Sequence, residues 1–128
     1  MPDVAIIGVA RTPFGRFPGR SALSLGVEAA RAALADAGVA WTDIGFAVGG
    51  SYEVDQPDAV VGELGLTGVQ FTNVYNGCAT AGSALAMASQ TIRLGDHGLG
   101  LVLTPFRTDP ETGDEVVTFA FTREAADA

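Results

Sequence analysis

The fold is decided by the stretch Val69-Gln70-Phe71-Thr72-Asn73-Val74-Tyr75-Asn76-Gly77-Cys78-Ala79-Thr80-Ala81-Gly82-Ser83-Ala84-Leu85-Ala86-Met87-Ala88-Ser89-Gln90-Thr91-Ile92. It predicts a strand, a tight Asn-Gly turn, the single cysteine Cys78 and a helix that extends to about Leu94. The stretch carries no charged residue, and a helix without charge on any face is typically buried all round. A cysteine in the first turn lies at the positive end of the helix dipole, which favours its thiolate. Because α/β enzymes present nucleophiles from such a strand–turn–helix, Cys78 is the candidate functional centre.

Composition limits the class of protein. At 128 residues the chain is long enough for one domain with its own core and too short for two ordinary ones. The net charge of −8 argues against nucleic acid and anionic membranes as partners, because both require a basic surface. The single cysteine cannot form an internal disulfide, which suits a cytoplasmic location. The apolar run Val4–Val9 lacks the basic flank of a secretory signal, and no run is apolar enough for membrane insertion.

Strands and helices alternate along the sequence. Strands are expected at Val4–Val9, Ile44–Val48, about Val69–Val74, Leu99–Thr104 and Val116–Phe121. Between them, helices are expected from Ser21 or Ser24 to about Ala37 (ended by Gly38), over Ala59–Leu64 (ended by Gly65) and after Cys78. This order predicts an α/β fold with a mostly parallel sheet and helices on both faces, its fifth strand antiparallel to the fourth. Residues 1–121 form one domain, residues 122–128 form a tail, and Trp41 is expected to pack rather than to bind.

Two polar segments are further candidates. Arg11–Arg20 is the only basic cluster, and it is either a solvated loop or a segment near a substrate or a subunit contact. The loop Gly49–Asp58 carries Glu53, Asp55 and Asp58, and paired carboxylates suggest acid–base or metal chemistry. No second cluster of ligands accompanies them, so a solvated loop is favoured and no metal site is expected. Asp58 is expected to cap the short helix that follows.

Three blocks of the sequence resemble the N-terminal half of the thiolases, most closely those of the sterol carrier protein X and lipid-transfer type. They are the opening Val4-Ala5-Ile6-Ile7-Gly8-Val9-Ala10-Arg11-Thr12-Pro13-Phe14-Gly15-Arg16-Phe17, the helix Ala29–Val39 and the nucleophile motif Asn73-Val74-Tyr75-Asn76-Gly77-Cys78-Ala79-Thr80-Ala81-Gly82-Ser83-Ala84-Leu85. The resemblance extends over about residues 3 to 104. It implies a thiolase-like βαβαβαββ half: a mixed five-stranded sheet between helices, with the last strand antiparallel.

The resemblance also implies a chemistry. In the family the motif cysteine, here Cys78, attacks an acyl-CoA thioester and carries the acyl group, and its backbone N–H helps to hold the oxyanion. A second acyl-CoA then condenses with the acyl group, or CoA cleaves a 3-ketoacyl chain in the reverse direction. Coenzyme A thioester is thus the substrate in lipid or sterol metabolism, and no bound cofactor is expected.

The sequence lacks several parts that are typical of the family. Family members are several times longer, and their activating histidine and second, acid–base cysteine lie in a half without counterpart here. The only histidine, His97, follows the far end of the Cys78 helix, roughly 25 Å away at about 1.5 Å per residue. A base must lie within hydrogen-bond reach, so His97 is expected to be a surface turn residue. The family's lid insertion is reduced to a polar loop, Pro105–Glu115. The isolated chain is therefore expected to be inactive.

A second interpretation is a non-catalytic module: a truncated product, or a subunit that another chain completes. Small residues form one face of the Cys78 helix, namely Ala79, Gly82, Ala86 and Ser89, and a half-domain cannot cover this face alone. This interpretation predicts a homo-oligomer, or a partner chain that supplies the C-terminal half.

A third interpretation is a related ketosynthase or thiolase-like aldolase, because these enzymes share the fold. Their distinguishing partners would lie in the missing half. The opening Arg11-Thr12-Pro13 and the motif Asn76-Gly77-Cys78-Ala79-Thr80 favour a thiolase. Tyr75, which stands where these thiolases tend to have Asn, is expected to be a packing residue.

Overall fold

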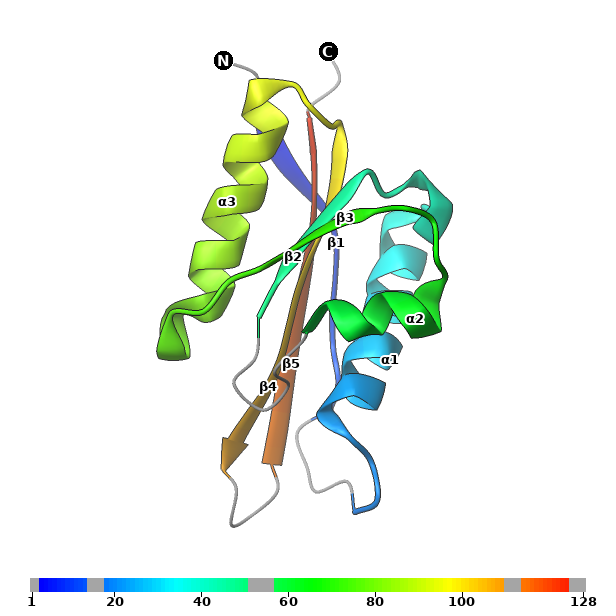
Figure 1. Ribbon diagram of the computed structural model, residues 1–128, viewed down its shortest axis with the longest axis vertical. Coiled ribbons are helices and arrows are strands. Elements are labelled where there is room, and N and C mark those ends of the chain that lie inside the picture. Colours follow the sequence, from blue (N-terminus) through cyan, green and yellow to red (C-terminus); the bar gives the residue numbers. More distant parts are fainter. Residues whose placement is uncertain (1–2, 14–17, 51–56, 110–113, 125–128) are drawn as a thin grey trace.

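The computed structural model describes the backbone of residues 3–13, 18–50, 57–109 and 114–124, and their side chains except Pro57, Cys78 and residues 105–124. In chain order the elements, with η for a 3₁₀ helix, are β1 (Val4–Arg11), α1 (Ala22–Ala37), η1 (Trp41–Asp43), β2 (Phe46–Gly49), η2 (Pro57–Ala59), α2 (Val60–Leu64), β3 (Gln70–Asn73), η3 (Gly77–Ala79), α3 (Thr80–Leu94), β4 (Leu99–Asp109) and β5 (Asp114–Glu124). The predicted α/β class is confirmed (Figure 1).

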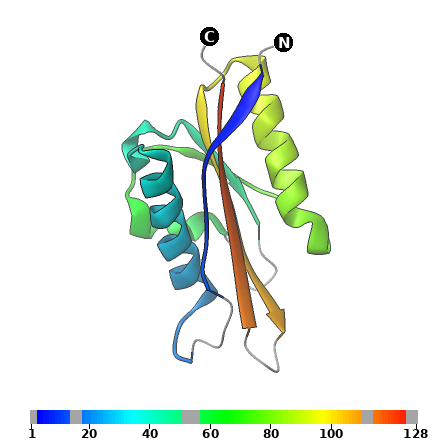
Figure 2. The ribbon, with the colours of Figure 1, turned by 180° about the vertical axis from the view of Figure 1, so that it is seen from behind.

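The strands form one sheet in the order β1-β5-β4-β2-β3. β2 pairs in parallel with both β3 and β4, whereas β5 runs antiparallel to β1 and β4. The carboxyl ends of β1, β2, β3 and β4 therefore lie at the same edge of the sheet. Helices α1 and α2 cover one face, and α3 covers the other (Figures 1 and 2).

Two clusters of apolar side chains lie on the two faces of the sheet. Leu25, Ala29 and Ala33 of α1 pack with Ala47 of β2 on one face. On the other face, side chains of α3 pack on the sheet in a cluster made of Phe46, Val48, Ala84, Ala88, Ile92 and Val102. All four residues of β2 are buried, as expected of a central strand covered on both faces.

The limits of α1 follow from local chemistry. The hydroxyl oxygen of Ser21 accepts a hydrogen bond from the backbone N–H of Ser24 at 3.1 Å, which caps the helix. Gly38 ends the helix with a φ of 70°, the left-handed conformation expected of a glycine there. The helix then lies directly on β1, because a β-carbon at Gly8 would come within 2.6 Å of the Ala37 β-carbon.

The predicted polar loop Pro105–Glu115 is wrong. Pro105–Asp109 continues β4, β5 begins at Asp114, and the two segments pair with each other. β5 also continues to Glu124, so Thr122–Glu124 of the predicted tail pair with β1. The cross-strand pairing stabilises residues whose polar composition by itself favours a loop, since strand formation depends on neighbours more than on intrinsic preference.

The predicted cap at Asp58 is also wrong. Asp58 lies inside η2, the N-cap of α2 is Ala59, and no side chain caps this helix. The η2 turn leads directly into α2, so the helix needs no separate capping side chain. By contrast, Gly65 ends α2 as predicted, and the Trp41 side chain packs as predicted, 9% exposed with its Nε1 donating to the Gly65 carbonyl.

Candidate functional site

The candidate site lies where parallel strands end. β2 ends at Gly49 and β3 ends at Asn73, and the chain then turns through Asn76 and η3 into α3. Cys78 is the middle residue of η3, so its backbone lies just before α3 and not in the first turn of that helix, where it was predicted. The Cys78 side chain lies outside the part that the structure describes. In open α/β sheets the carboxyl ends of the strands are the usual place for a ligand.

Hydrogen bonds close the turn around Cys78. The Thr80 hydroxyl accepts from the backbone N–H of Asn76 at 3.0 Å and donates to the Gly77 carbonyl at 2.7 Å. The amide of Asn76 donates to the hydroxyl oxygen of Ser83 at 2.9 Å, which ties the turn to α3. Gly77 has a φ of 55°, in the left-handed region. The Asn-Gly pair thus forms the turn that its sequence predicts.

The sheet supports this turn closely. The backbone N–H of Val74 donates to the Gly49 carbonyl at 2.8 Å, which extends the pairing of β2 and β3. A β-carbon at Gly50 would overlap the Val74 carbonyl oxygen and lie 2.7 Å from Cγ2 of Thr80. Only glycine at position 50 lets the chain entering the turn approach β2 in this way.

Few charged side chains surround the turn. Asp58 of η2 accepts a hydrogen bond from the Asn73 amide at 3.1 Å, at the end of β3. α3 carries no charge before Arg93 in its last turn. Glu53 and Asp55 lie outside the described residues, and within the described part no three His, Cys, Asp or Glu side chains are grouped to hold a metal ion. Tyr75, expected to pack, is 69% exposed instead.

His97 lies at the opposite end of α3 from Cys78. The helix between them has 15 residues, about 22 Å at 1.5 Å per residue, so His97 is not within reach as a base. The side chain is half-buried, and its ring lies 5.5 Å from that of Phe46, centroid to centroid. It also lies over Gly45, where a β-carbon would come within 2.9 Å of its Nδ1. His97 is therefore a turn residue that packs, and not simply a solvated one.

The expected burial of α3 on all sides is not found. Its buried residues recur every fourth position and form one face: Thr80, Ala84, Ala88 and Ile92. Gly82 and Ala86 are exposed, as is Ala79 just before the helix, and Ser89 is half-buried. The lack of charged residues along most of α3 therefore did not mean that the helix is buried on all sides. The predicted small-residue face is present and is uncovered in this chain.

An uncovered apolar strip of the sheet lies on the same side as α3. Ile7 and Ala10 of β1 pack against the α1 cluster, and the register of β1 shifts between Ile6 and Gly8. The residues before and after this irregularity, Ile6 and Val9, therefore face the α3 side. Their side chains are 53% and 57% exposed. Figure 2 shows β1 at the edge of the sheet, with its N-terminal end near the last turn of α3.

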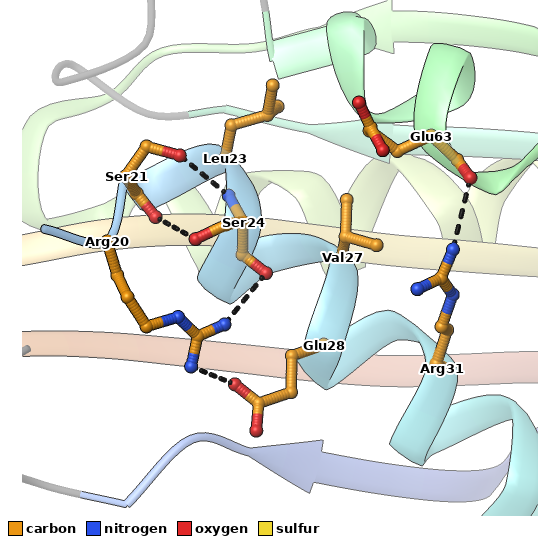
Figure 3. A pocket seen from close by; sticks show the side chains of 8 residues that line it. All are labelled: Arg20, Ser21, Leu23, Ser24, Val27, Glu28, Arg31 and Glu63. Carbon is orange, nitrogen blue, oxygen red and sulfur yellow. Dashed lines mark hydrogen bonds and ion pairs between the residues drawn. The ribbon is translucent and has the colours of Figure 1, made fainter.

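A separate hollow of about 480 Å³ lies on the opposite face of the sheet, between α1 and α2 (Figure 3). It is lined by Arg20, Ser21, Leu23, Ser24, Val27, Glu28, Arg31 and Glu63. Arg20 pairs with Glu28 at 2.7 Å, and Arg31 donates to the Glu63 carbonyl at 3.2 Å. Sequence reasoning did not identify this hollow, because Glu63 joins it only through folding. Arg20, part of the basic segment, is here engaged within the chain.

The chain is similar to curated proteins at the sequence level. It is 38% identical to sterol carrier protein 2 of Bos taurus over an alignment of 100 residues that covers 72% of this chain and 18% of that protein. It is 37% identical to sterol carrier protein 2 of Homo sapiens over 98 residues, with the same shares. Non-specific lipid-transfer protein-like 2 of Caenorhabditis elegans is 34% identical over an alignment of 108 residues that covers 78% of this chain and 26% of that protein. The chain thus spans about a fifth to a quarter of these relatives' length. No family model matches.

Solved structures show the same architecture. The priming β-ketosynthase of the R1128 polyketide pathway has a TM-score of 0.80 at 18% identity, covering 95% of this chain and 50% of that chain. The 3-oxoacyl-[acyl-carrier-protein] synthase III of Aquifex aeolicus VF5 has a TM-score of 0.80 at 16% identity, covering 97% and 55%. OleA of Xanthomonas campestris with bound lauric acid and lauroyl-CoA has a TM-score of 0.81 at 14% identity, covering 95% and 56%. This chain has the fold of about half of each protein.

Proposed function

Because this chain is a homologue of sterol carrier protein 2 and has the fold of half a thiolase-like ketosynthase, we propose that it is the nucleophile-bearing half of a thiolase-type acyl-CoA C-acyltransferase. The relatives support a thiolase-like acyltransferase or lipid-binding function. One observation carries the more specific proposal: the backbone of Cys78 lies between the end of β3 and the start of α3, at the carboxyl edge of the sheet. The positive end of a helix favours a thiolate there.

The proposed reaction begins with acyl transfer to Cys78. Its thiolate attacks the carbonyl carbon of an acyl-CoA, the carbon–sulfur bond to CoA breaks, and CoA leaves as a thiolate. The thiol proton of Cys78, removed by a base, is available to the departing CoA sulfur. The acyl group on Cys78 is then transferred to the α-carbon of a second acyl-CoA, which loses a proton, and the Cys78 thiolate leaves. In the reverse direction Cys78 attacks the 3-keto carbon of a 3-ketoacyl-CoA, the carbon–carbon bond breaks to release a shorter acyl-CoA, and CoA removes the acyl group from Cys78. Backbone N–H groups at the start of α3 would stabilise the oxyanion.

The base for this reaction would come from another polypeptide segment. His97 is the chain's only histidine, and α3 separates it from Cys78. We therefore propose that a second copy or a partner chain completes the site, with acyl-CoA as the substrate and the cytoplasm as the location. Among the helices that the structure describes, none combines the length and the apolar character needed to cross a bilayer.

Mass spectrometry tests the nucleophile directly. At a pH high enough for the Cys78 thiolate to form without a base, we expect incubation with acetyl-CoA, or with a longer acyl-CoA, to add one acyl group to the peptide that contains Cys78. The Cys78→Ala variant should take up none. Absence of an adduct from a protein whose Cys78 still reacts with iodoacetamide at an ordinary rate would contradict the proposal.

A ketosynthase-like role is the second candidate, because the solved structures that share the fold include a β-ketosynthase and a 3-oxoacyl-[acyl-carrier-protein] synthase III. The same experiment distinguishes it when an acyl-carrier-protein thioester is offered beside acyl-CoA. Faster labelling of Cys78 from the carrier protein would favour a ketosynthase, and faster labelling from CoA would favour a thiolase.

A further inference from the structure

The hydroxyl of Thr80 uses both of its hydrogen-bonding functions on the turn before it. It accepts from the Asn76 N–H at 3.0 Å and donates to the Gly77 carbonyl at 2.7 Å. The Thr80 side chain is only 5% exposed, so water does not readily replace these bonds. Since Cys78 lies between the two bonded residues and Thr80, the hydroxyl closes the backbone loop in which Cys78 is held.

These bonds differ from those that a helical threonine usually makes. Thr91, in the same helix, donates to the Met87 carbonyl one turn earlier at 2.9 Å and is bound only within α3. Thr80 bonds to residues before α3, and its Cγ2 lies against Gly50 next to β2. The methyl group of Thr80 thus packs beside β2, while its hydroxyl holds the turn through two hydrogen bonds.

A second bond ties the turn from outside. The Asn76 amide donates to the Ser83 hydroxyl at 2.9 Å, near the surface. Loss of this bond leaves no deeply buried group unpaired. By contrast, replacing the Thr80 hydroxyl with a methyl group leaves the Asn76 N–H without its partner, which favours opening of the turn.

We propose that Thr80 is a positioning residue for Cys78, and that the Asn76–Ser83 bond assists it. The inference rests on the proposed role of Cys78 as the nucleophile. Thr80 keeps η3 at the positive end of α3, where the thiolate is favoured. If the turn opens, Cys78 leaves this position and the thiolate becomes less favoured.

The charges around the turn do not depend on Thr80. Asp58 of η2 is held by Asn73, and Arg11, at the end of β1, has its own partner. β2 and β3 carry no charge, and α3 carries none before Arg93. Among β4 and β5, the ionisable residues nearest this edge are Arg107, Asp109, Asp114 and Glu115. A change at Thr80 leaves all of these groups in the protein, so a shift in Cys78 titration would report on the turn.

The test is the pH dependence of iodoacetamide alkylation at Cys78. We expect Thr80→Val to raise the midpoint by about 0.5 pH unit, the usual size of a helix-dipole effect. Thr80→Ser keeps the hydroxyl and should retain the wild-type midpoint. Thr91→Val is the matched control, because it removes a hydroxyl from the same helix without touching the turn. A Thr80→Val midpoint equal to that of wild type would overturn the inference.

Thermal unfolding of each variant shows whether it is folded when alkylated. If Thr80→Val does not fold, Ser83→Ala decides the question, because its bond is near the surface. We expect a smaller upward shift from Ser83→Ala, and an unchanged midpoint would overturn the inference. Acyl-CoA is not used, so the two proposals fail separately. A Thr80-dependent midpoint without any acyl adduct contradicts only the acyltransferase, and an adduct with a Thr80-independent midpoint contradicts only the role of Thr80.

Discussion

Gly77 adopts a backbone conformation that residues with a β-carbon rarely adopt, although a side chain at this position would have room. Its φ of 55° lies in the left-handed region, yet a β-carbon added there would meet no atom within 4 Å. The glycine is therefore required by backbone conformation and not by crowding. This separates it from Gly50, where the surrounding atoms leave no space.

We expect Gly77→Ala to lower the free energy of unfolding by about 1 kcal/mol, the usual cost of a left-handed conformation for a residue with a β-carbon. Gly82→Ala is the matched control, since Gly82 lies in α3, has open space and lacks a positive φ. It should stabilise the chain by about 0.5 to 1 kcal/mol because alanine favours the helix. Urea unfolding measures the free energy of unfolding of both variants. An unchanged value for Gly77→Ala would show that a side chain at position 77 does not strain the turn.

Among elements, the junction of β2 with the Cys78 turn is the tightest part of the site. The turn approaches β2 so closely that position 50 holds only a hydrogen atom facing Val74 and Thr80. Strand β2, the turn and the start of α3 are thus packed as one unit. A substitution at Gly50, directly after β2, should therefore alter the position of Cys78, although the two residues are 28 positions apart in the chain.

We expect Gly50→Ala to destabilise the chain by about 2 kcal/mol or more, because overpacking a close contact forces the backbone to move. The same variant should slow the alkylation of Cys78 at neutral pH. Gly62→Ala in α2 is the control, since a β-carbon there meets no atom within 4 Å. Equal stability of Gly50→Ala and wild type, by denaturant unfolding, would contradict this packing.

At the scale of the whole molecule, the α3 side of the sheet is incompletely covered. Gly82 and Ala86 of α3 are exposed, and Ile6 and Val9 of β1 are more than half exposed on the same side. The chain corresponds to about half of each solved structure that shares its fold. Exposed apolar residues gathered on one side of a sheet often mark a contact with another protein segment.

We therefore expect the isolated chain to self-associate, and Ala86→Glu to shift it toward the monomer by placing a charge on the uncovered face. Ala32→Glu is the matched control, because Ala32 is exposed on α1, on the other side of the sheet. Both substitutions keep a good helix former, so α3 and α1 should persist. Size-exclusion chromatography with light scattering measures the effect. A monodisperse wild-type monomer would contradict the expected association.

The sequence by itself determined the elements with strong local signals. Two serines, Ser21 and Ser24, were candidates for the start of α1, and the structure shows that Ser21 is the cap. Gly38 marked the end of α1, Gly65 ended α2, and Asn76-Gly77 placed the turn before Cys78. Each is a matter of backbone conformation or capping, which depends on a few adjacent residues. The resemblance to thiolases around Cys78 could likewise be found from the sequence, because the motif is continuous in the chain.

Only the tertiary structure decided the features that depend on residues far apart in the sequence, namely strand length, burial and side-chain contacts. β4 and β5 extend through polar sequence because each strand supplies the hydrogen-bonding partner of the other. α3 is uncharged over most of its length, yet one face stays exposed because only one sheet face is available to cover it. The roles of Thr80 and Gly50 appear only when the turn meets β2. Turns and helix ends depend on a few adjacent residues, whereas the burial of a side chain and its hydrogen-bonding partners depend on which segments folding brings together.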